Sequence, residues 1–230
     1  MDKNNVGKLF DSIAGTYDRF NHLLSLNVDK SWRRRGVKRF PGGKEVLDVA
    51  TGTADLAIEL VRRNKAEHVT GVDISTGMME IGREKIRKAG YEGQISLVEG
   101  SALDLPFENC SFDGVSCAFG VRNFSDLDKG LSEMQRVLKD GGSLMILEFS
   151  YPSNPVVRAV YNCFFSNLMP VVGKAVSGNG GAYRYFRDSV KGFIWGKEMA
   201  ARLESAGFTD VRYRTMSLGI CTLYTAVKRS

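Results

Sequence analysis

The sequence predicts an α/β fold in which helices cover both faces of a mostly parallel sheet. From residue 45 onward, short runs with strand character alternate with segments of helical periodicity, as in such sheets. The composition, with 43% hydrophobic and 25% charged residues, is that of an ordinary globular domain. A length of 230 residues suits one α/β domain with an elaborated cap better than two small domains. We therefore expect residues 1–230 to form a single domain.

Seven segments have the length and residue types of strands. They are residues 45–49, 68–73, 95–99, 112–117, 144–149, 211–217 and 220–228. Only Leu218 and Gly219 separate the last two strands, so we expect these to pair antiparallel as a hairpin.

Helices are expected between the strands. Four apolar residues recur at helical spacing: Leu127, Leu131, Met134 and Leu138. Gly141 is expected to end that helix, and Ser75 to cap a helix that runs to about Lys88. A further helix is expected to start near Asp55.

Two segments lie outside this alternation. Residues 1–44 are expected to form an N-terminal cap of two helices. Residues 151–196 are rich in aromatics and follow the fifth strand. We expect them to form a substrate cap over the carboxyl edge of the sheet, because open α/β sheets bind ligands at that edge.

Composition excludes several classes of protein. Four cysteines without CxxC spacing argue against a disulfide scaffold or a metal site and suit a reducing cytoplasm. The N-terminus lacks the apolar core of a signal peptide, and the longest uncharged stretch is too short to span a bilayer. The net charge of +6 permits contact with anionic partners, and six basic residues crowd between Lys30 and Arg39.

The turn after the first strand predicts a nucleoside site. Asp48 is followed by small residues around Gly52, where a ligand can approach the backbone closely. A dinucleotide site needs a third glycine where this chain has Asp55, and a carboxylate there would repel a diphosphate. S-adenosylmethionine has no phosphate and carries an ammonium and a sulfonium, so carboxylates near it are favourable.

Two later turns complete this interpretation. The second strand ends in Asp73, whose carboxylate can accept hydrogen bonds from both ribose hydroxyls. A cap of the following helix is the alternative for Asp73. After the third strand, Ser101 and Ala102 are expected beside the adenine ring, with a simple surface turn as the alternative.

These motifs, in this order, resemble the class I SAM-dependent methyltransferases. Residues 17–25, followed by Trp32, are similar to the N-terminal signature of the quinone-biosynthesis C-methyltransferases, which act on menaquinone and ubiquinone precursors. Residues 136–142 and 148–150 resemble their second signature, and residues 119–123 also look like theirs. The resemblance covers nearly the whole chain. It implies a Rossmann-like seven-stranded sheet with an antiparallel last strand and SAM contacts at Thr53, Asp73, Ser101 and Ala102.

The chain departs from the family pattern at several positions. Ala50 and Ala54 stand where many class I methyltransferases have glycine, and Ala118 replaces a serine that touches SAM in some relatives. Asp29 stands where the first signature often has histidine. Asn21-His22 and Asp29 are more similar to the menaquinone branch, so the expected reaction is methylation of demethylmenaquinol. A benzoquinol, a soluble small molecule or a lipid is the alternative substrate.

Methyl transfer to a quinol ring needs one general base or a base-activated water, because loss of the hydroxyl proton makes the ring carbon nucleophilic. The candidates are His22, Asp29 and Asp18. Arg122 is placed to steady a phenolate, with an ordinary ion pair as the alternative. Tyr17 is expected to close over the methionine end of SAM, with core packing as the alternative.

Expected partners follow from the implied substrate. The aromatic cap could hold an isoprenoid tail along a helical run of Val157, Val160, Tyr161, Phe164, Phe165 and Leu168, or that run could be a buried cap helix. The segment from Lys30 to Arg39, with Trp32 and Phe40, could lie on an anionic membrane at the inner face of the cell membrane. A solvated basic helix face is the alternative.

We expect no nucleic-acid partner, and a homo-oligomer stays open. A dehydrogenase and a non-catalytic scaffold of a quinone-synthesis complex are the remaining alternatives.

Overall fold

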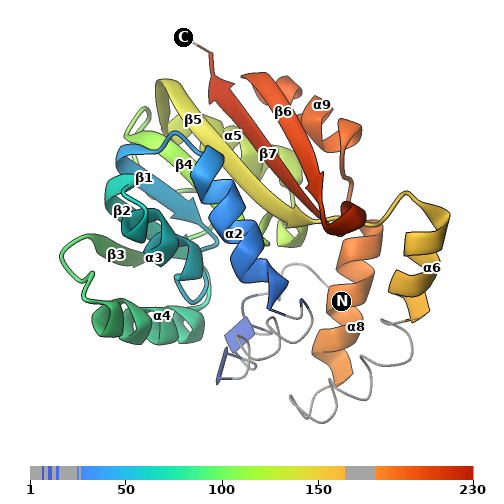
Figure 1. The fold of residues 1–230 in the computed structure, drawn as a ribbon. Helices are drawn as coiled ribbons and strands as arrows, with labels where there is room; N and C mark the ends of the chain where they lie inside the picture. Colours follow the sequence, from blue (N-terminus) through green and yellow to red (C-terminus); the bar gives the residue numbers. More distant parts are fainter. Residues whose placement is uncertain are drawn as a thin grey trace.

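A seven-stranded sheet, in the order β3-β2-β1-β4-β5-β7-β6, forms the centre of the molecule (Figure 1). The computed structural model describes residues 27–163 and 180–229, together with residues 7, 10, 11, 14, 15 and 25. The strands are β1 (Gly43–Val49), β2 (Ala66–Asp73), β3 (Ile95–Glu99), β4 (Phe112–Ala118), β5 (Leu138–Phe149), β6 (Phe208–Met216) and β7 (Cys221–Lys228). β7 runs antiparallel to both β5 and β6, and the pairings among β1 to β5 are parallel. The predicted sheet and its terminal hairpin are therefore confirmed.

One boundary was wrong. The helix expected to reach Gly141 ends at Val137, and β5 begins directly at Leu138. Leu138 is fully buried and pairs with Phe112 of β4, so strand pairing ends the helix early. Gly141 lies instead in the irregular start of β5, with a φ of +74° that favours glycine.

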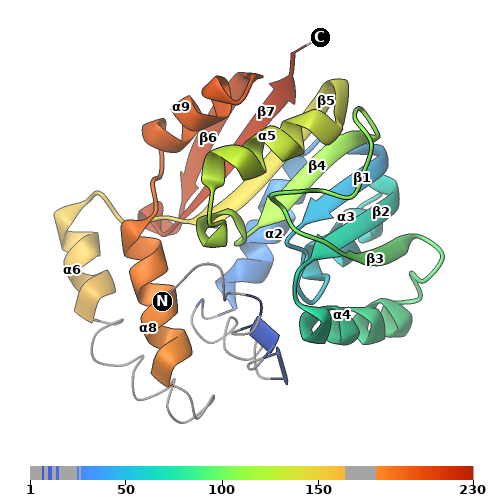
Figure 2. The ribbon, with the colours of Figure 1, turned by 180° about the vertical axis from the view of Figure 1, so that it is seen from behind.

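Helices cover both faces of the sheet. α2 (Val28–Arg39) and α3 (Asp55–Arg62) lie on the face nearer the viewer in Figure 1. α5 (Leu127–Val137) and α9 (Lys197–Ser205) lie on the opposite face (Figure 2). α4 (Thr76–Ala89) packs against β3, β2 and α3. Ser75 caps α4 as predicted, since its side chain accepts a hydrogen bond from the amide of Met78.

The alternation of side chains along β1 divides the core in two. Val46 belongs to a buried cluster on the α2 and α3 side, whereas Leu47 belongs to one on the α5 and α9 side. Both faces of the strand are buried from Val46 to Val49, and the apolar residues there are interrupted only by Asp48.

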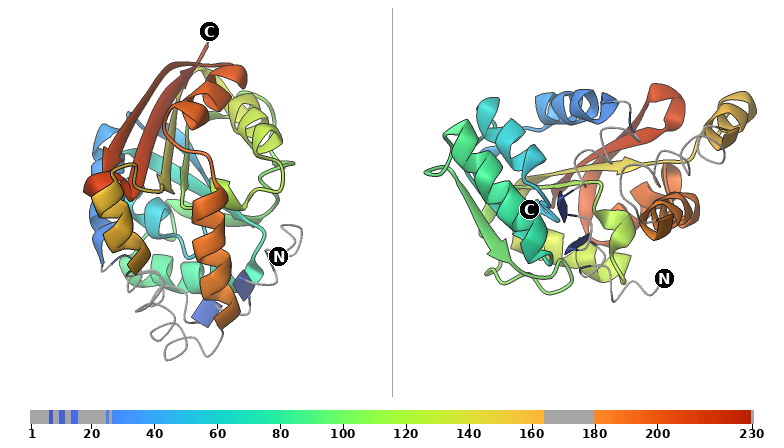
Figure 3. Two further views of the ribbon diagram at one scale, coloured as in Figure 1. Left: turned by 90° about the vertical axis from the view of Figure 1, so that its right-hand side faces the viewer. Right: turned by 90° about the horizontal axis from the view of Figure 1, so that it is seen from below.

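The carboxyl ends of the parallel strands meet at one end of the sheet. α6 (Pro155–Cys163) and α8 (Gly180–Gly192) follow β5 and extend beyond that end (Figure 3). Two short 3₁₀ helices also lie there: η2 (Val121–Asn123) after β4, and η4 (Ser217–Gly219) between β6 and β7. In the run expected to hold an isoprenoid tail, Tyr161 is buried and Val160 is exposed, while Phe164, Phe165 and Leu168 lie outside the described residues.

Most apolar residues of α2 face the core, and Val28 at its start is the exposed one. Trp32 and Phe40 are buried in the core, and Gly36 allows α2 to approach Met145 and Leu223 of the sheet closely. Trp32 and Phe40 therefore cannot anchor the helix in a membrane, which corrects that part of the prediction. The side of α2 that faces outward is mainly basic.

Candidate active site

The loop between β1 and α3 is held in a conformation that exposes its backbone. Ala50, Gly52 and Ala54 all have left-handed φ values, of 54°, 55° and 63°. Any residue with a Cβ pays roughly 1–2 kcal/mol in this conformation and glycine does not, so Gly52 adopts it freely whereas Ala50 and Ala54 carry strain. The chain here turns sharply and presents its main chain to the adjoining cavity.

Asp73 connects this loop to the next strand. One carboxylate oxygen accepts the amide of Gly52 at 2.8 Å, and the other accepts the amide of Ser75 at 2.9 Å. The side chain lines the cavity. Burial raises the pKa of Asp73, although the two amide hydrogen bonds oppose this shift. Each oxygen keeps a second lone pair, so both ribose hydroxyls can still be bound.

Asp48 lies directly beneath the loop. Its carboxylate accepts hydrogen bonds from the hydroxyls of Thr51, at 2.7 Å, and Ser116, at 2.8 Å. Burial raises the pKa of Asp48 to about 6. Neither Asp48 nor Thr51 is among the residues that line the cavity, so the predicted contact of Asp48 with the cofactor stays a prediction.

A cavity of about 530 Å³ lies where these turns meet. This volume falls within the range of small-molecule sites. Its lining includes Gly52, Asp73, Ser101 and Ala102, so four of the predicted cofactor contacts meet in one place. Val72, Ile74, Met78, Leu103 and Phe124 supply apolar walls suited to an adenine ring.

The charges on this cavity select its ligand. Among the described residues that line it, the two charged ones are both acidic, Asp11 and Asp73. Asp11 accepts a hydrogen bond from the Ser75 hydroxyl at 2.6 Å. With Asp48 beneath the loop, this wall suits a cationic sulfonium donor and disfavours a diphosphate. The residues present therefore fit S-adenosylmethionine.

Thr53 lies elsewhere than predicted. Its hydroxyl accepts a hydrogen bond from the Lys85 ammonium at 3.0 Å, and its side chain does not line the cavity. Lys85 also pairs with Asp55, and the Arg33 guanidinium lies 3.6 Å from the same carboxylate. Thr53 thus belongs to a charged network beside the loop.

Asp29 belongs to the same network. It is buried, accepts a hydrogen bond from Ser25 at 2.6 Å and forms an ion pair with Arg33. It does not line the cavity. The structure therefore connects Asp29 through Arg33 to the loop after β1, and does not bring it to a reacting centre.

Arg122 is buried in η2. Its guanidinium pairs with Glu148 at 2.9 Å, donates to the Phe119 carbonyl and lies over the rings of Phe149 and Phe186. The side chain does not line the cavity. The ion-pair alternative is the one that this geometry favours.

Tyr17, Asp18 and His22 lie outside the described residues, so their predicted roles stay predictions. Asp11 and Asn123 line the cavity but were not predicted. Asp11 lay in a segment without a recognisable motif. Asn123 could have been found, since it directly follows Arg122 in the family-like stretch. No cluster of metal-ligating side chains occurs in the part of the chain that the structure describes.

Comparisons with known proteins identify the family of this chain. The model of the ubiE/COQ5 methyltransferase family matches residues 1–228. The chain is 43% identical over 225 residues to a demethylmenaquinone methyltransferase of Bacteroides fragilis, covering 97% of this chain and 92% of the relative. It is 44% identical over 226 residues to a ubiquinone/menaquinone biosynthesis C-methyltransferase UbiE of Geobacter sulfurreducens, covering 97% and 88%.

Solved structures share the fold. A SAM-dependent methyltransferase of Thermotoga maritima matches with a TM-score of 0.69 at 19% identity, covering 97% of this chain and 99% of that one. A phosphoethanolamine N-methyltransferase of Haemonchus contortus, in complex with S-adenosyl-L-methionine, matches with a TM-score of 0.64 at 16% identity, covering 86% and 52%. The family match over residues 1–228 and the relatives of 43–44% identity show that this chain belongs to the ubiE/COQ5 family of SAM-dependent methyltransferases.

Proposed function

We propose that this chain transfers the methyl group of S-adenosylmethionine to a ring carbon of demethylmenaquinol. The observation that carries the proposal is the cavity beside the loop after β1, in which the charged residues described, Asp11 and Asp73, are both acidic. Relatives named for demethylmenaquinone methylation support the choice of acceptor. The acceptor ring would enter from the side of α6 and α8, which act as the substrate cap.

The bound donor supplies an electrophilic methyl group, so the protein's task is mainly to position the reactants. Asp73 would hold the ribose, Ser101 and Ala102 would flank the adenine, and Gly52 would allow close approach of the methionine end. Such alignment is worth about 7–11 kcal/mol of barrier at best. Tyr17 and His22 would complete the site from the N-terminal segment, as donor lid and as proton acceptor.

A direct assay tests the proposal. Purified protein is incubated with labelled S-adenosylmethionine and either demethylmenaquinol or a ubiquinone-type benzoquinol, and the products are identified by mass spectrometry. We expect label on the naphthoquinol ring carbon. Labelling of the benzoquinol alone would favour the alternative suggested by the relative named for both quinones. Label on neither quinol would overturn the proposal.

Asp73→Ala tests the cofactor half of the proposed site by its affinity for S-adenosylhomocysteine. It removes the acceptor for the amides of Gly52 and Ser75 and for the ribose, so the affinity for S-adenosylhomocysteine should fall by about tenfold or more. Asp113→Ala is the control, because Asp113 is a strand carboxylate at the amino end of β4 that accepts hydrogen bonds from the Glu45 amide and Lys139 away from the cavity.

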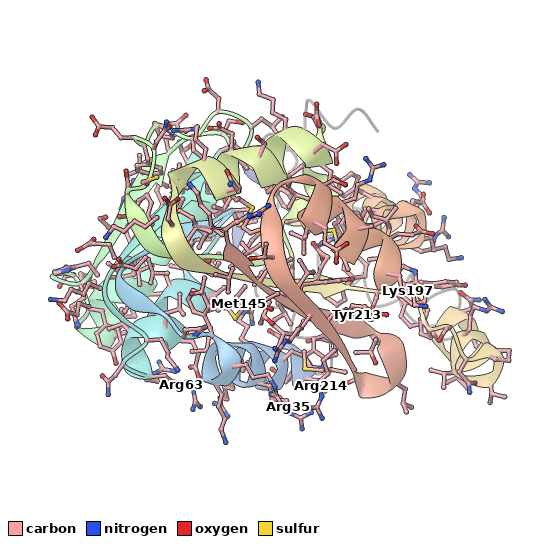
Figure 4. The ribbon with its side chains drawn as sticks, turned by 90° about the horizontal axis from the view of Figure 1, so that it is seen from above. Arg35, Arg63, Met145, Lys197, Tyr213 and Arg214 are labelled. Atoms are coloured by element: carbon pink, nitrogen blue, oxygen red, sulfur yellow. The ribbon has the colours of Figure 1, made fainter. Side chains whose placement is uncertain are left out.

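We also propose that the enzyme docks on anionic membranes at the cytoplasmic face. Seven basic residues form what we call the basic surface: Lys30, Arg34, Arg35, Lys38 and Arg39 of α2 with Arg212 and Arg214 of β6. Among the described residues, none of the seven forms an ion pair. Arg35 and Arg214 point to the same side of the molecule (Figure 4).

Exposed apolar residues lie at the adjoining end of the sheet. Leu218 of η4 is 76% exposed, and Val156 and Val160 of α6 are 71% and 67% exposed. A surface with apolar tips and a neighbouring basic face suits the interface of an anionic bilayer, where the tips enter and the cations meet headgroups. No described helix is long and apolar enough to cross a bilayer.

Vesicle flotation tests the docking. Each cation near an anionic surface is worth about 1 kcal/mol, so Arg35→Ser with Arg214→Ser should weaken binding to phosphatidylglycerol vesicles roughly thirtyfold. The control is Arg83→Ser with Arg87→Ser on α4, outside the basic surface. It should bind the vesicles like the wild type. Equal binding by both double variants would refute this docking surface.

A further inference from the structure

One hydrogen bond joins the cap to the wall of the cavity. The hydroxyl of Tyr185, on α8, donates to Oδ1 of Asn123 at 2.9 Å. Asn123 is the last residue of η2 and lines the cavity. Its backbone is fixed as well, because its amide donates to the Gly120 carbonyl at 2.9 Å. One hydrogen bond thus holds the side-chain amide of Asn123 and another holds its backbone.

This hydrogen bond sets the orientation of the amide group. Burial raises the pKa of the Tyr185 phenol, so it stays protonated and remains a donor at neutral pH. Since Oδ1 of Asn123 accepts that proton, the Nδ2 group is on the opposite branch of the amide, with two donors of its own. A partner that fixes one end of a polar side chain fixes what its other end offers to a ligand.

The ring of Tyr185 is held by packing on its other side. It lies against the small cluster formed by Ala14 and Met78, together with Phe10 and Ile81. Phe10 and Met78 also line the cavity. Tyr185 therefore spans from the cap to residues beside the cofactor half of the cavity.

The position of Asn123 relates it to the reacting atoms. Ala118, Phe119 and Gly120, which directly precede η2, line the same cavity as Gly52 and Asp73. An acceptor ring that meets a donor held at Gly52 and Asp73 would share this cavity with Asn123. The side-chain amide would then be available to a ring oxygen of the bound quinol.

We propose that Asn123 donates from Nδ2 to the quinol oxygen that loses its proton, and that Tyr185 is the positioning residue that aims this donor. The inference rests on the proposed quinol methylation. In that reaction the hydroxyl proton leaves to a base or water, and the ring carbon attacks the methyl group. The S–C bond breaks as the C–C bond forms, giving S-adenosylhomocysteine. The ring carbon then releases its own proton and the oxygen takes up a proton, which restores the aromatic quinol with a net release of one proton. Negative charge gathers on the oxygen before attack, and a fixed donor stabilises it there.

Tyr185→Phe tests the positioning role, since it removes the hydroxyl and keeps the ring that packs in the cluster. We expect kcat to fall about tenfold while the Kd for S-adenosylhomocysteine changes less than twofold. The chain offers a matched control in Tyr151, whose hydroxyl donates to Asn162 at 2.8 Å, also in the cap. Tyr151→Phe loses the same kind of bond away from the cavity and should keep wild-type kcat.

The pH dependence of kcat distinguishes positioning of the Asn123 donor from a general structural role of the hydrogen bond. A donor to the phenolate lowers the pKa of the bound hydroxyl, so its loss should move the acidic limb of kcat up by about one pH unit. Asn123→Ala should show this shift with a loss of about a hundredfold in kcat. Adding Tyr185→Phe to Asn123→Ala should cause no further loss, because the hydroxyl acts only through the amide.

Each outcome decides. Wild-type kcat and an unmoved limb in Tyr185→Phe would overturn the inference alone, as would equal losses in Tyr185→Phe and Tyr151→Phe, which would indicate a weakened cap. A raised Kd for S-adenosylhomocysteine with unchanged kcat would place Tyr185 in cofactor binding instead. A wild-type protein inactive on both quinols would overturn the proposed function and this inference with it.

Discussion

Asp48 is a buried carboxylate whose charge favours the ligand and disfavours the fold. Its pKa is raised to about 6 by burial, above the value of 3.8 expected in the unfolded chain. Between these two values the native state binds more protons than the unfolded state. The proton that Asp48 keeps in the native state therefore raises the free energy of unfolding. This stabilisation is fully present below about pH 4 and is lost as the pH rises through about 6. The shift corresponds to at most about 3 kcal/mol.

Asp48→Asn should remove this dependence. Above pH 7 we expect the variant to unfold with a higher free energy than the wild type, because no charge has to be buried, and to bind S-adenosylhomocysteine more weakly. Urea unfolding at pH 4, 6 and 8 measures the first effect and calorimetric titration the second. Parallel pH curves for the two proteins would contradict a raised pKa at Asp48. Ser116→Ala is a second test. Loss of its hydrogen bond to Asp48 should raise the pKa of Asp48 further, so the loss of stability should extend to higher pH.

Arg122 and Glu148 form a buried ion pair, with side chains 4% and 1% exposed. Removing one partner of such a pair leaves an uncompensated buried charge. We expect Arg122→Ala to lower the free energy of unfolding by about 3–5 kcal/mol. Adding Glu148→Gln should recover part of that loss, which denaturant titration of the single and double variants would show. A loss below about 1 kcal/mol in Arg122→Ala would contradict the buried pair.

At the scale of the element, the strand-loop-helix unit from β1 to α3 concentrates backbone strain. Ala54 precedes α3 with a φ of 63°, where glycine is more favourable. Ala54 is fully buried, so Ala54→Gly relieves about 1–2 kcal/mol of strain but also loses a core methyl group and frees the unfolded chain, and we expect the free energy of unfolding to change by less than about 0.5 kcal/mol. The matched control is Ala57→Gly within α3, which is equally buried but helical, so it has no strain to relieve and should lose about 2 kcal/mol. Thermal unfolding of both variants measures the difference, and a destabilisation of equal size would contradict the strain.

At the scale of the whole molecule, the cavity joins segments that are far apart in the chain. Its lining comes from the N-terminal residues, from the loops after β1 to β4 and from η2. A ligand that binds only this assembled site stabilises the native state by about 2.7 kcal/mol at a hundredfold excess over its Kd. Saturating S-adenosylhomocysteine should therefore raise Tm by roughly 5–10 °C. NAD should leave Tm unchanged, and a shift with NAD but not with S-adenosylhomocysteine would contradict the acidic site.

The sequence by itself determined the α/β alternation, the terminal hairpin, the loop of small residues after Asp48 and the acid at the end of β2. These features depend on local periodicity and on residues near in the chain, so they are visible without contacts. The end of α5 was not predictable, because Leu138 leaves the helix to pair with Phe112 in another strand.

Only the tertiary structure decided what surrounds each candidate residue. It pairs Arg122 with Glu148, Asp29 with Arg33 and Thr53 with Lys85, and buries the apolar side of α2 against the sheet. It also brings Tyr185 to Asn123, 62 residues away along the chain. Such partners are set by which elements pack together, and no local pattern of residue types encodes them.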